Sequence, residues 1–347
     1  MQRRSRGRIV VVGDVHGCLD SLQRVLQLAG VIDGRCQWCA RHGAQLVICG
    51  DMIDEGACSK HVVHLVRALQ VQAGEQVTAL IGNHELLLLR ALVQDPSALV
   101  WETVWSWAGT DADLQAALVR HCVPRLTTAS IRESFQQTFV ASGSAEYPSE
   151  YADACTSVSK EAAHEVAGLF RDALRRDGTL AWLESLPVAK KVGNWGFFHG
   201  GPPCGFAGGI DRLNAAFSEL LRDRQWQHPL LEPYSSLNSP IGTRRWMADG
   251  EEAVEELLAS FGIDHVAFGH SPGAINGIFG QLDQRWDKAF KADTYFSLGV
   301  EGFLEILDDS IWAVYTDVGR EVFRRVHPTR PELPQVALLS TIAGLEH

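Results

Sequence analysis

The side chains best suited to chemistry stand in five short, glycine-flanked motifs. In chain order these are GDVHG (residues 13–17), GDMIDEG (50–56), GNHE (82–85), FHGG (198–201) and GHS (269–271). The flanking glycines allow sharp turns and close backbone approach. Oxygen and imidazole donors without thiolate suit Mn, Fe or Zn. The candidate donors are Asp14, His16, Asp51, Asn83, His84, His199 and His270.

Negative charge is concentrated where one apolar run ends. The stretch LVICGDMIDEG places Asp51, Asp54 and Glu55 within five residues. Like charges so close together repel, so a partner must neutralise or use them. Six of the candidate donors could hold two metal ions if Asp51 bridges them. Such an ion pair, about 3.5–4 Å apart, clamps a phosphoryl group and lowers the pKa of a shared water.

The first third of the chain alternates between strand and helix patterns. Strands are predicted over 8–14, 44–51 and 76–83, and helices with one apolar face over 19–32 and 59–72. This alternation indicates crossover units and a mostly parallel sheet. Ligand sites of open α/β sheets lie at the carboxyl ends of the strands. We therefore expect the first three motifs to meet at one edge.

From about residue 86 to 180 the pattern becomes helical and irregular, which predicts a helical insertion or cap. It contains Trp101, Trp105 and Trp107 and a polar, loop-like stretch at 141–154. The tryptophans are expected to form the core of the insertion; the alternative is an aromatic wall that faces the substrate.

Strand-like segments return in the last part of the chain and suggest a second sheet. They cover residues 186–201, 263–271, 294–300, 303–309 and 310–318. This places His199 and His270 at strand ends as well. The whole chain, 1–347, is therefore interpreted as a single catalytic domain that contains the insertion.

Composition narrows the classes of function. The net charge of -11 argues against a nucleic-acid polymer as partner, because such binding needs clustered Lys and Arg. The start of the chain does not read as a signal peptide, and ELLLLRALV (85–93) is too short to span a bilayer. We expect a soluble, cytoplasmic protein without a membrane partner.

The eight cysteines are too few for a disulfide scaffold in a chain of this length. Cys36 and Cys39, with His42 nearby, could hold zinc or form a redox pair. A second CxxC is missing, so isolated cysteines are the favoured interpretation. Helical histidines such as His61 and His64 are expected to be packed or solvated.

The five motifs, in this order, resemble the signature of the calcineurin-like metallophosphoesterases. The PPP-type phosphatases are the nearest branch, and the bacterial Shewanella-like group is the most similar within it. The resemblance covers residues 8–85 well and 182–320 more loosely. It implies an α/β fold with four αββα layers, in which two mixed β-sheets are flanked by helices.

The resemblance also implies a role for each motif residue. Two divalent ions (Mn, Fe or Zn) are expected, the first held by Asp14, His16 and Asp51, and the second by Asp51, Asn83, His199 and His270. His84 is expected to protonate the leaving oxygen, oriented by Asp54.

The implied reaction is hydrolysis of phosphate monoesters, on phosphoproteins or small molecules, by attack of a dimetal-bound hydroxide. A nucleotide or dinucleoside-polyphosphate hydrolase, or a phosphodiesterase, is the enzymatic alternative. The other alternative is a catalytically weak pseudophosphatase that binds metal.

The second motif departs from the family pattern. The resemblance to PPP phosphatases implies a phosphate-binding Arg at this position, where the sequence has Glu55. Glu repels phosphate where Arg grips it. Glu55 could turn away and pair with a basic residue, while Arg244 or Arg245 of PIGTRRW (240–246) binds phosphate. Alternatively, Glu55 meets a cationic or hydroxyl-bearing part of the substrate, or the enzyme is weakened.

Overall fold

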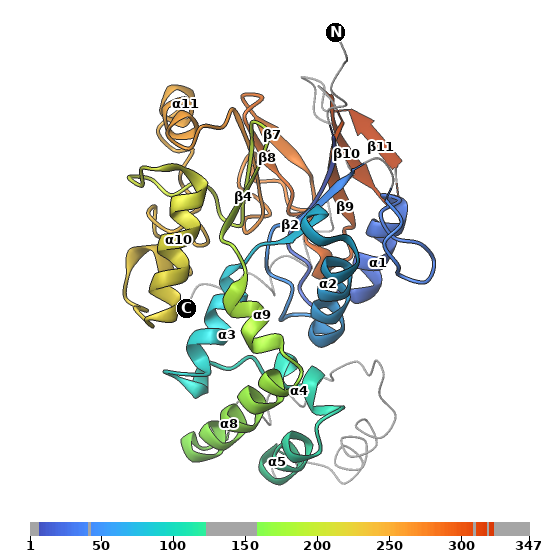
Figure 1. Cartoon of the computed structure of the whole chain (residues 1–347), viewed down its shortest axis with the longest axis vertical. Coiled ribbons are helices and arrows are strands. Elements are labelled where there is room, and N and C mark those ends of the chain that lie inside the picture. Colours follow the sequence, from blue (N-terminus) through green and yellow to red (C-terminus); the bar gives the residue numbers. More distant parts are fainter. Residues whose placement is uncertain (1–6, 41–42, 123–157, 308–309, 318, 323–347) are drawn as a thin grey trace.

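Two β-sheets stack face to face and carry helices on their outer sides (Figure 1). The computed structural model describes residues 7–40, 43–122, 158–307, 310–317 and 319–322. Apolar side chains of the two sheets form one cluster between them, and a larger cluster lies between the sheets and the helices. The predicted αββα sandwich is thereby confirmed.

The first sheet has six strands in the order β11-β10-β9-β1-β2-β3. Their bounds are β1 Arg8–Val12, β2 Gln45–Ile48, β3 Val77–Ala79, β9 Gly302–Leu307, β10 Ser310–Tyr315 and β11 Gly319–Val322. Strands β1, β2 and β3 are parallel, as predicted, and β9 pairs antiparallel with β1. The assignment of 303–309 and 310–318 to the second sheet was therefore wrong, because the free edge of β1 takes up β9.

The second sheet has five strands in the order β4-β5-β6-β8-β7. Their bounds are β4 Ala189–Val192, β5 Trp195–Phe198, β6 His265–Phe268, β7 Asp283–Arg285 and β8 Ala289–Lys291. The central strands β5, β6 and β8 are parallel, and the two edge strands are antiparallel to their neighbours. The strand predicted at 294–300 was wrong: Tyr295 and Gly299 both have positive φ and enclose a short 3₁₀ turn.

After their first residues, Arg8 and Gln45, strands β1 and β2 are apolar because they are buried on both faces. Along β1, Ile9 and Val11 pack between the sheets, whereas Val10 and Val12 pack against the helices. Helices α1 (Leu19–Leu28) and α2 (Ser59–Ala73) lie beside the first sheet, and α10 (Gly209–Arg222) and α11 (Glu251–Ser260) beside the second (Figure 1).

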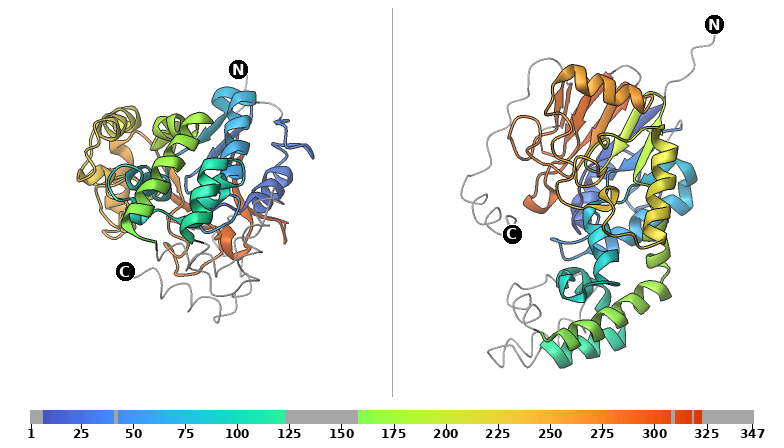
Figure 2. Two further views of the ribbon diagram at one scale, coloured as in Figure 1. Left: turned by 90° about the horizontal axis from the view of Figure 1, so that it is seen from below. Right: turned by 90° about the vertical axis from the view of Figure 1, so that its left-hand side faces the viewer.

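The remaining helices extend from the open end of the sandwich (Figure 2). They are α3 Asn83–Ala91, α4 Trp101–Ala108, α5 Ala112–Cys122, α8 Lys160–Arg176 and α9 Thr179–Ser185. Short 3₁₀ turns are η1 Gly74–Gln76, η2 Pro96–Ala98, η4 Pro229–Leu231 and η5 Phe296–Leu298. Within the described ranges, none of the helices has the length and apolarity needed to cross a lipid bilayer.

Trp101, Trp105 and Trp107 are buried, as expected for a core of the helical region. The polar stretch 141–154 lies outside the described residues, and the role of 86–180 as a cap stays a prediction.

Asp177 joins this helical region to α2. Its carboxylate accepts hydrogen bonds from Trp107 Nε1 (2.9 Å), His64 Nε2 (3.3 Å) and the Thr179 amide (2.9 Å). Partial burial raises the pKa of Asp177, but these hydrogen bonds lower it more, and the net pKa lies below its usual value. The carboxylate therefore stabilises the fold most when it is ionised.

We expect Asp177→Asn to lower the free energy of unfolding by about 1–3 kcal/mol at neutral pH, because buried donors lose a charged acceptor. The loss should be measured by urea unfolding. Because the folded-state pKa is depressed, the stabilisation is present above about pH 4 and is lost as the pH falls further. The gap between wild type and variant should therefore narrow in acid. Asp172→Asn, an exposed control in helix α8, which Asp177 follows directly, should change stability by under about 0.5 kcal/mol.

Candidate metal centre

The five motifs meet at the carboxyl ends of parallel strands from both sheets. Asp14 follows β1, Asp51 follows β2, Asn83 follows β3, His199 follows β5 and His270 follows β6. Close approach at this edge depends on glycine: a Cβ on Gly82 or Gly269 would overlap the carboxylate of Asp51 or Asp14.

Two groups of buried side chains are close enough to hold metal ions. The ligand atoms of Asp14, His16 and Asp51 lie within 4.8 Å of one another, as do those of Asp51, His199 and His270. Asp51 belongs to both groups, which is what a bridging carboxylate requires. All members of these two groups are buried.

Backbone carbonyls set the histidine tautomers. The Nδ1–H groups of His16 and His199 donate to Ile53 O (3.2 Å) and Cys49 O (2.8 Å), respectively. In the neutral rings this leaves each Nε2 with a lone pair. Nε2 of His199 lies 2.8 Å from Asn83 Oδ1 and 3.3 Å from Asp51 Oδ2.

Lone pairs that converge without a hydrogen to share repel one another, and a cation relieves this. Nε2 of His270 is also buried without a hydrogen-bond partner, although native structures pair nearly all such atoms. The residues present therefore fit a divalent cation, with the oxygen and nitrogen donors that Mn, Fe or Zn accept.

The shifted pKa values of the buried aspartates also favour a bound cation. Burial and the charges of Asp293 and Asp51 raise the pKa of Asp14 well above its usual value. Burial also raises the pKa of Asp51, but the nearby His199, His84 and His16 lower it more strongly. Buried carboxylates are costly unless paired or bound to metal, and a cation would stabilise both as anions.

His84 is held by two aspartates at the start of α3. Its Nδ1–H donates to Asp54 Oδ2 (2.7 Å), and its amide donates to Asp51 Oδ1 (2.9 Å). Asp54 also accepts a hydrogen bond from the Thr103 hydroxyl. Burial lowers the pKa of His84, but Asp51, Asp54 and Glu55 outweigh it and raise the pKa to about 10. Its Nε2 lies 4.0 Å from Asp51 Oδ2.

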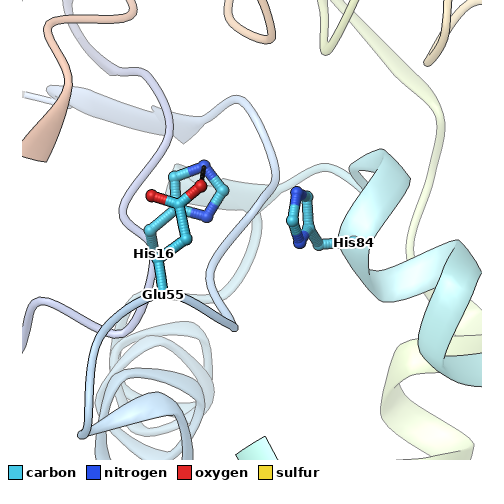
Figure 3. A group of neighbouring side chains, drawn as sticks. All are labelled: His16, Glu55 and His84. Atoms are coloured by element: carbon cyan, nitrogen blue, oxygen red, sulfur yellow. Dashed lines mark ion pairs between the residues drawn. The ribbon is translucent and has the colours of Figure 1, made fainter. Parts of the chain in front are cut away.

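Glu55 lies beside the candidate ligands, and its basic partner is His16, so the three explanations for its role stay predictions. Its Oε1 lies 3.8 Å from His16 Nε2, and its Oε2 accepts a hydrogen bond from Ser297 Oγ (2.6 Å). Figure 3 shows its carboxylate beside the ring of His16, with His84 across the gap from α3. Together the three offer ligand atoms within 4.8 Å of one another.

The two candidate phosphate-binding arginines are both exposed, but they differ in their contacts. Arg244 Nη1 donates to Ser271 Oγ (3.5 Å), next to His270. Arg244 is also one of the charges, after burial and His199, that lower the pKa of His270. For Arg245 the described residues show no side-chain contact with the metal ligands. Of the two arginines, Arg244 is thus the one with a hydrogen bond to a residue next to a candidate metal ligand.

Glu85 is a buried positioning residue that the sequence reasoning missed. Its carboxylate accepts hydrogen bonds from the amides of Asp51 (2.9 Å), Met52 (2.7 Å) and Gly82 (2.8 Å). It thus ties the second motif to the third. The available signal was its place three residues after Gly82, since a Glu there closes a capping box at a helix start.

Cys36 and Cys39 are free thiols. Neither belongs to a group of potential metal ligands in the described residues. His42 lies outside the described residues, so the zinc alternative remains untested.

A family model for calcineurin-like phosphoesterases matches residues 7–274, well over half of the chain. The chain therefore belongs to the calcineurin-like phosphoesterase family, as the motifs predicted. The cold-active protein-tyrosine phosphatase of a psychrophile Shewanella species shares this fold, with a TM-score of 0.55 and 18% sequence identity. That match covers 92% of this chain and 80% of that chain.

Curated relatives match over a short region. A symmetrical bis(5'-nucleosyl)-tetraphosphatase of Psychromonas ingrahamii is 37% identical over 79 residues, which is 23% of this chain and 24% of that protein. Shewanella-like protein phosphatase 2 of Arabidopsis thaliana is 30% identical over 84 residues, 23% of this chain and 21% of that protein. The matched region thus spans about a quarter of these relatives. The Shewanella-like relatives support the PPP-type branch.

We expect Glu85→Gln to weaken metal binding roughly 10- to 100-fold, because residues that orient metal ligands act on this scale. The amide NH₂ of Gln would face at least one backbone N–H that now donates to Glu85. Mn²⁺ affinity should be measured by competition with a fluorescent chelator. The exposed Glu256→Gln is the matched control and should bind as wild type does. Equal affinities for all three proteins would contradict the positioning role.

Proposed function

We propose that this protein is a metal-dependent phosphatase that hydrolyses phosphate monoesters on phosphoproteins or small molecules. The observation that carries the proposal is the placement of His84, whose ring is held by Asp54 and whose Nε2 lies 4.0 Å from Asp51 in the shared ligand set.

Two divalent ions (Mn, Fe or Zn), when bound, polarise a phosphoryl group and lower the pKa of a water. The first would be held by Asp14, His16 and Asp51, and the second by Asp51, Asn83, His199 and His270. The buried, mutually repelling donor atoms of these residues support that assignment.

His84 supplies the proton that the leaving oxygen needs. An alkoxide leaving from a phosphate monoester is a strong base, so its departure is assisted by a positioned acid. Asp54 accepts the Nδ1–H of His84 and so keeps the other ring nitrogen directed to the substrate side. A phosphate leaving group, whose second pKa is about 6, has less need of this proton. The built acid therefore favours monoesters over polyphosphates.

Arg244 and Glu55 set the charge at the edge of the centre. Arg244 is exposed near His270 and is positioned to meet phosphate oxygens as a charged donor. Glu55 is partly exposed beside His16 and opposes a phosphate dianion. Substrate affinity should reflect the balance of these two side chains. Arg245 remains a weaker candidate for the same role.

The second candidate function is hydrolysis of a dinucleoside polyphosphate or a phosphodiester. Two observations favour it: similarity to relatives named symmetrical bis(5'-nucleosyl)-tetraphosphatases, and Glu55, whose charge repels a monoanionic diester less than a dianionic monoester.

With Mn²⁺ added, we expect the protein to hydrolyse 4-nitrophenyl phosphate and phosphopeptides faster than bis(4-nitrophenyl) phosphate, nucleoside triphosphates or a dinucleoside tetraphosphate. His84→Ala should lower kcat on phosphoserine peptides by about 10²–10⁴-fold, because an alkoxide needs the acid. The loss should be smaller on 4-nitrophenyl phosphate, whose leaving group is a weak base. Steady-state kinetics on the panel measures both effects.

The exposed His61→Ala on α2 is the control for His84→Ala and should keep full activity, while Asp51→Asn should abolish turnover. If diesters or dinucleoside tetraphosphates react faster than monoesters, the second candidate function replaces the first. If Asp51→Asn leaves turnover intact, the proposed centre is wrong.

We expect Glu55→Arg to raise kcat/KM on 4-nitrophenyl phosphate by roughly tenfold, because it exchanges a repelling charge for a charged hydrogen-bond donor to phosphate. Glu55→Gln should give a smaller gain. The remote, exposed Glu75→Arg makes the same charge change and should have no effect. A loss of activity in Glu55→Arg would mean that the carboxylate itself serves binding or chemistry.

A further inference from the structure

A cavity of about 390 Å³ lies at the opposite end of α3 from Asn83 and His84. It is lined by the end of α3, by α8, α9 and α10, and by the residues that follow α10; α9 contacts each of the other three helices. Its size falls within the roughly 300–1,000 Å³ of small-molecule sites. Leu89, Leu92 and Leu221 give it an apolar wall.

The charged side chains of this cavity are mainly cationic, although the chain as a whole is acidic. Four arginines line it against one acid, Glu184; they are Arg171, Arg175, Arg222 and Arg224. Arg175 pairs with Asp172 (3.1 Å) and Arg222 with Asp223 (3.5 Å). Both of these pairs are exposed and therefore weak. The cavity thus keeps a net positive lining in a protein whose net charge is -11.

Two buried donors in the lining have no acceptor. Nε of Arg171 and Nε1 of Trp226 are both inaccessible to solvent and make no hydrogen bond. Trp226 is 6% exposed. Native proteins pair nearly all buried N–H groups. Because both nitrogens are inaccessible, they are covered by protein atoms and do not meet a ligand in the cavity. The exposed Arg224 lines the cavity and forms no ion pair with the described residues, so it is the cation best able to meet an oxyanion there.

We propose that this cavity binds an amphipathic anion, with an apolar body against the leucines and an oxyanion head that accepts hydrogen bonds from the guanidinium group of Arg224. Arg175 and Arg222 supply further positive charge. The head can be a carboxylate or a phosphate, since arginine binds both through paired N–H groups. This site is separate from the metal ligands and does not depend on the proposed phosphatase activity.

The test uses 8-anilinonaphthalene-1-sulfonate, a fluorescent molecule with an apolar body and one sulfonate. We expect one molecule to bind the full chain saturably, and decanoate or decyl phosphate to displace it at least about tenfold more effectively than decanol. Comparing the two anions tells which head is preferred. Arg224→Met should weaken probe binding about tenfold.

Arg212→Met is the matched control. Arg212 is an exposed arginine of α10, the helix that precedes Arg224, and its guanidinium donates to Ala207 O outside the cavity lining. It should bind the probe as wild type does. Ser218→Trp, at an exposed lining position, should block binding without altering the core. Thermal melting monitors folding of every variant.

Two results would overturn the proposal. One is unchanged probe binding in both Arg224→Met and Ser218→Trp when both melt as wild type does. The other is displacement by decanol that equals displacement by decanoate, since the cavity would then recognise apolar surface alone.

Discussion

The crowding of buried electron pairs at the strand ends is the constraint on which the rest of this structure depends. Asp14 and Asp51 are both almost fully buried, with Asp293 close enough to raise the pKa of Asp14. Imidazole nitrogens face the same space. The free-energy cost of burying an unpaired charge exceeds the net stability of a typical domain. The two cations of the proposed function would neutralise these carboxylates and pair with the imidazole nitrogens.

The backbone around this centre is strained as well. His16, Asp51, Asp54, Glu55 and His270 all have φ between 45° and 68°, a region that non-glycine residues avoid at a cost of order 1–3 kcal/mol each. Surrounding structure must hold these turns in place. Glu85 does so from within α3 by fixing three amides, and the glycines do so by letting the two sheets close to contact distance.

The sequence predicted the parts of the fold that rest on local pattern. Alternating strands and helices predicted the parallel core of the first sheet. The motifs at the strand ends predicted which side chains the structure brings together, because the carboxyl ends of parallel strands meet at one edge of a sheet. Strand partners were harder: β9 and β10 read as ordinary strands, and nothing local says which sheet has the open edge. Likewise, Phe296–Leu298 has a strand-like composition, and only its flanking positive φ values exclude a strand. Glu85 was missed because a helix cap and a support for metal ligands look alike in sequence.

The position of Glu55 follows from the backbone conformation, and its effect on phosphate binding follows from its charge. Its positive φ and the hydrogen bond from Ser297 direct the carboxylate toward His16. In the proposed function, Glu55 lowers the positive charge of the centre by one where Arg would raise it by one. Attraction for a phosphate dianion would fall accordingly, and so would retention of the phosphate product. A centre of this kind gives up affinity for compact, highly charged phosphates. Selectivity must then come from contacts between the rest of the substrate and side chains outside the metal ligands.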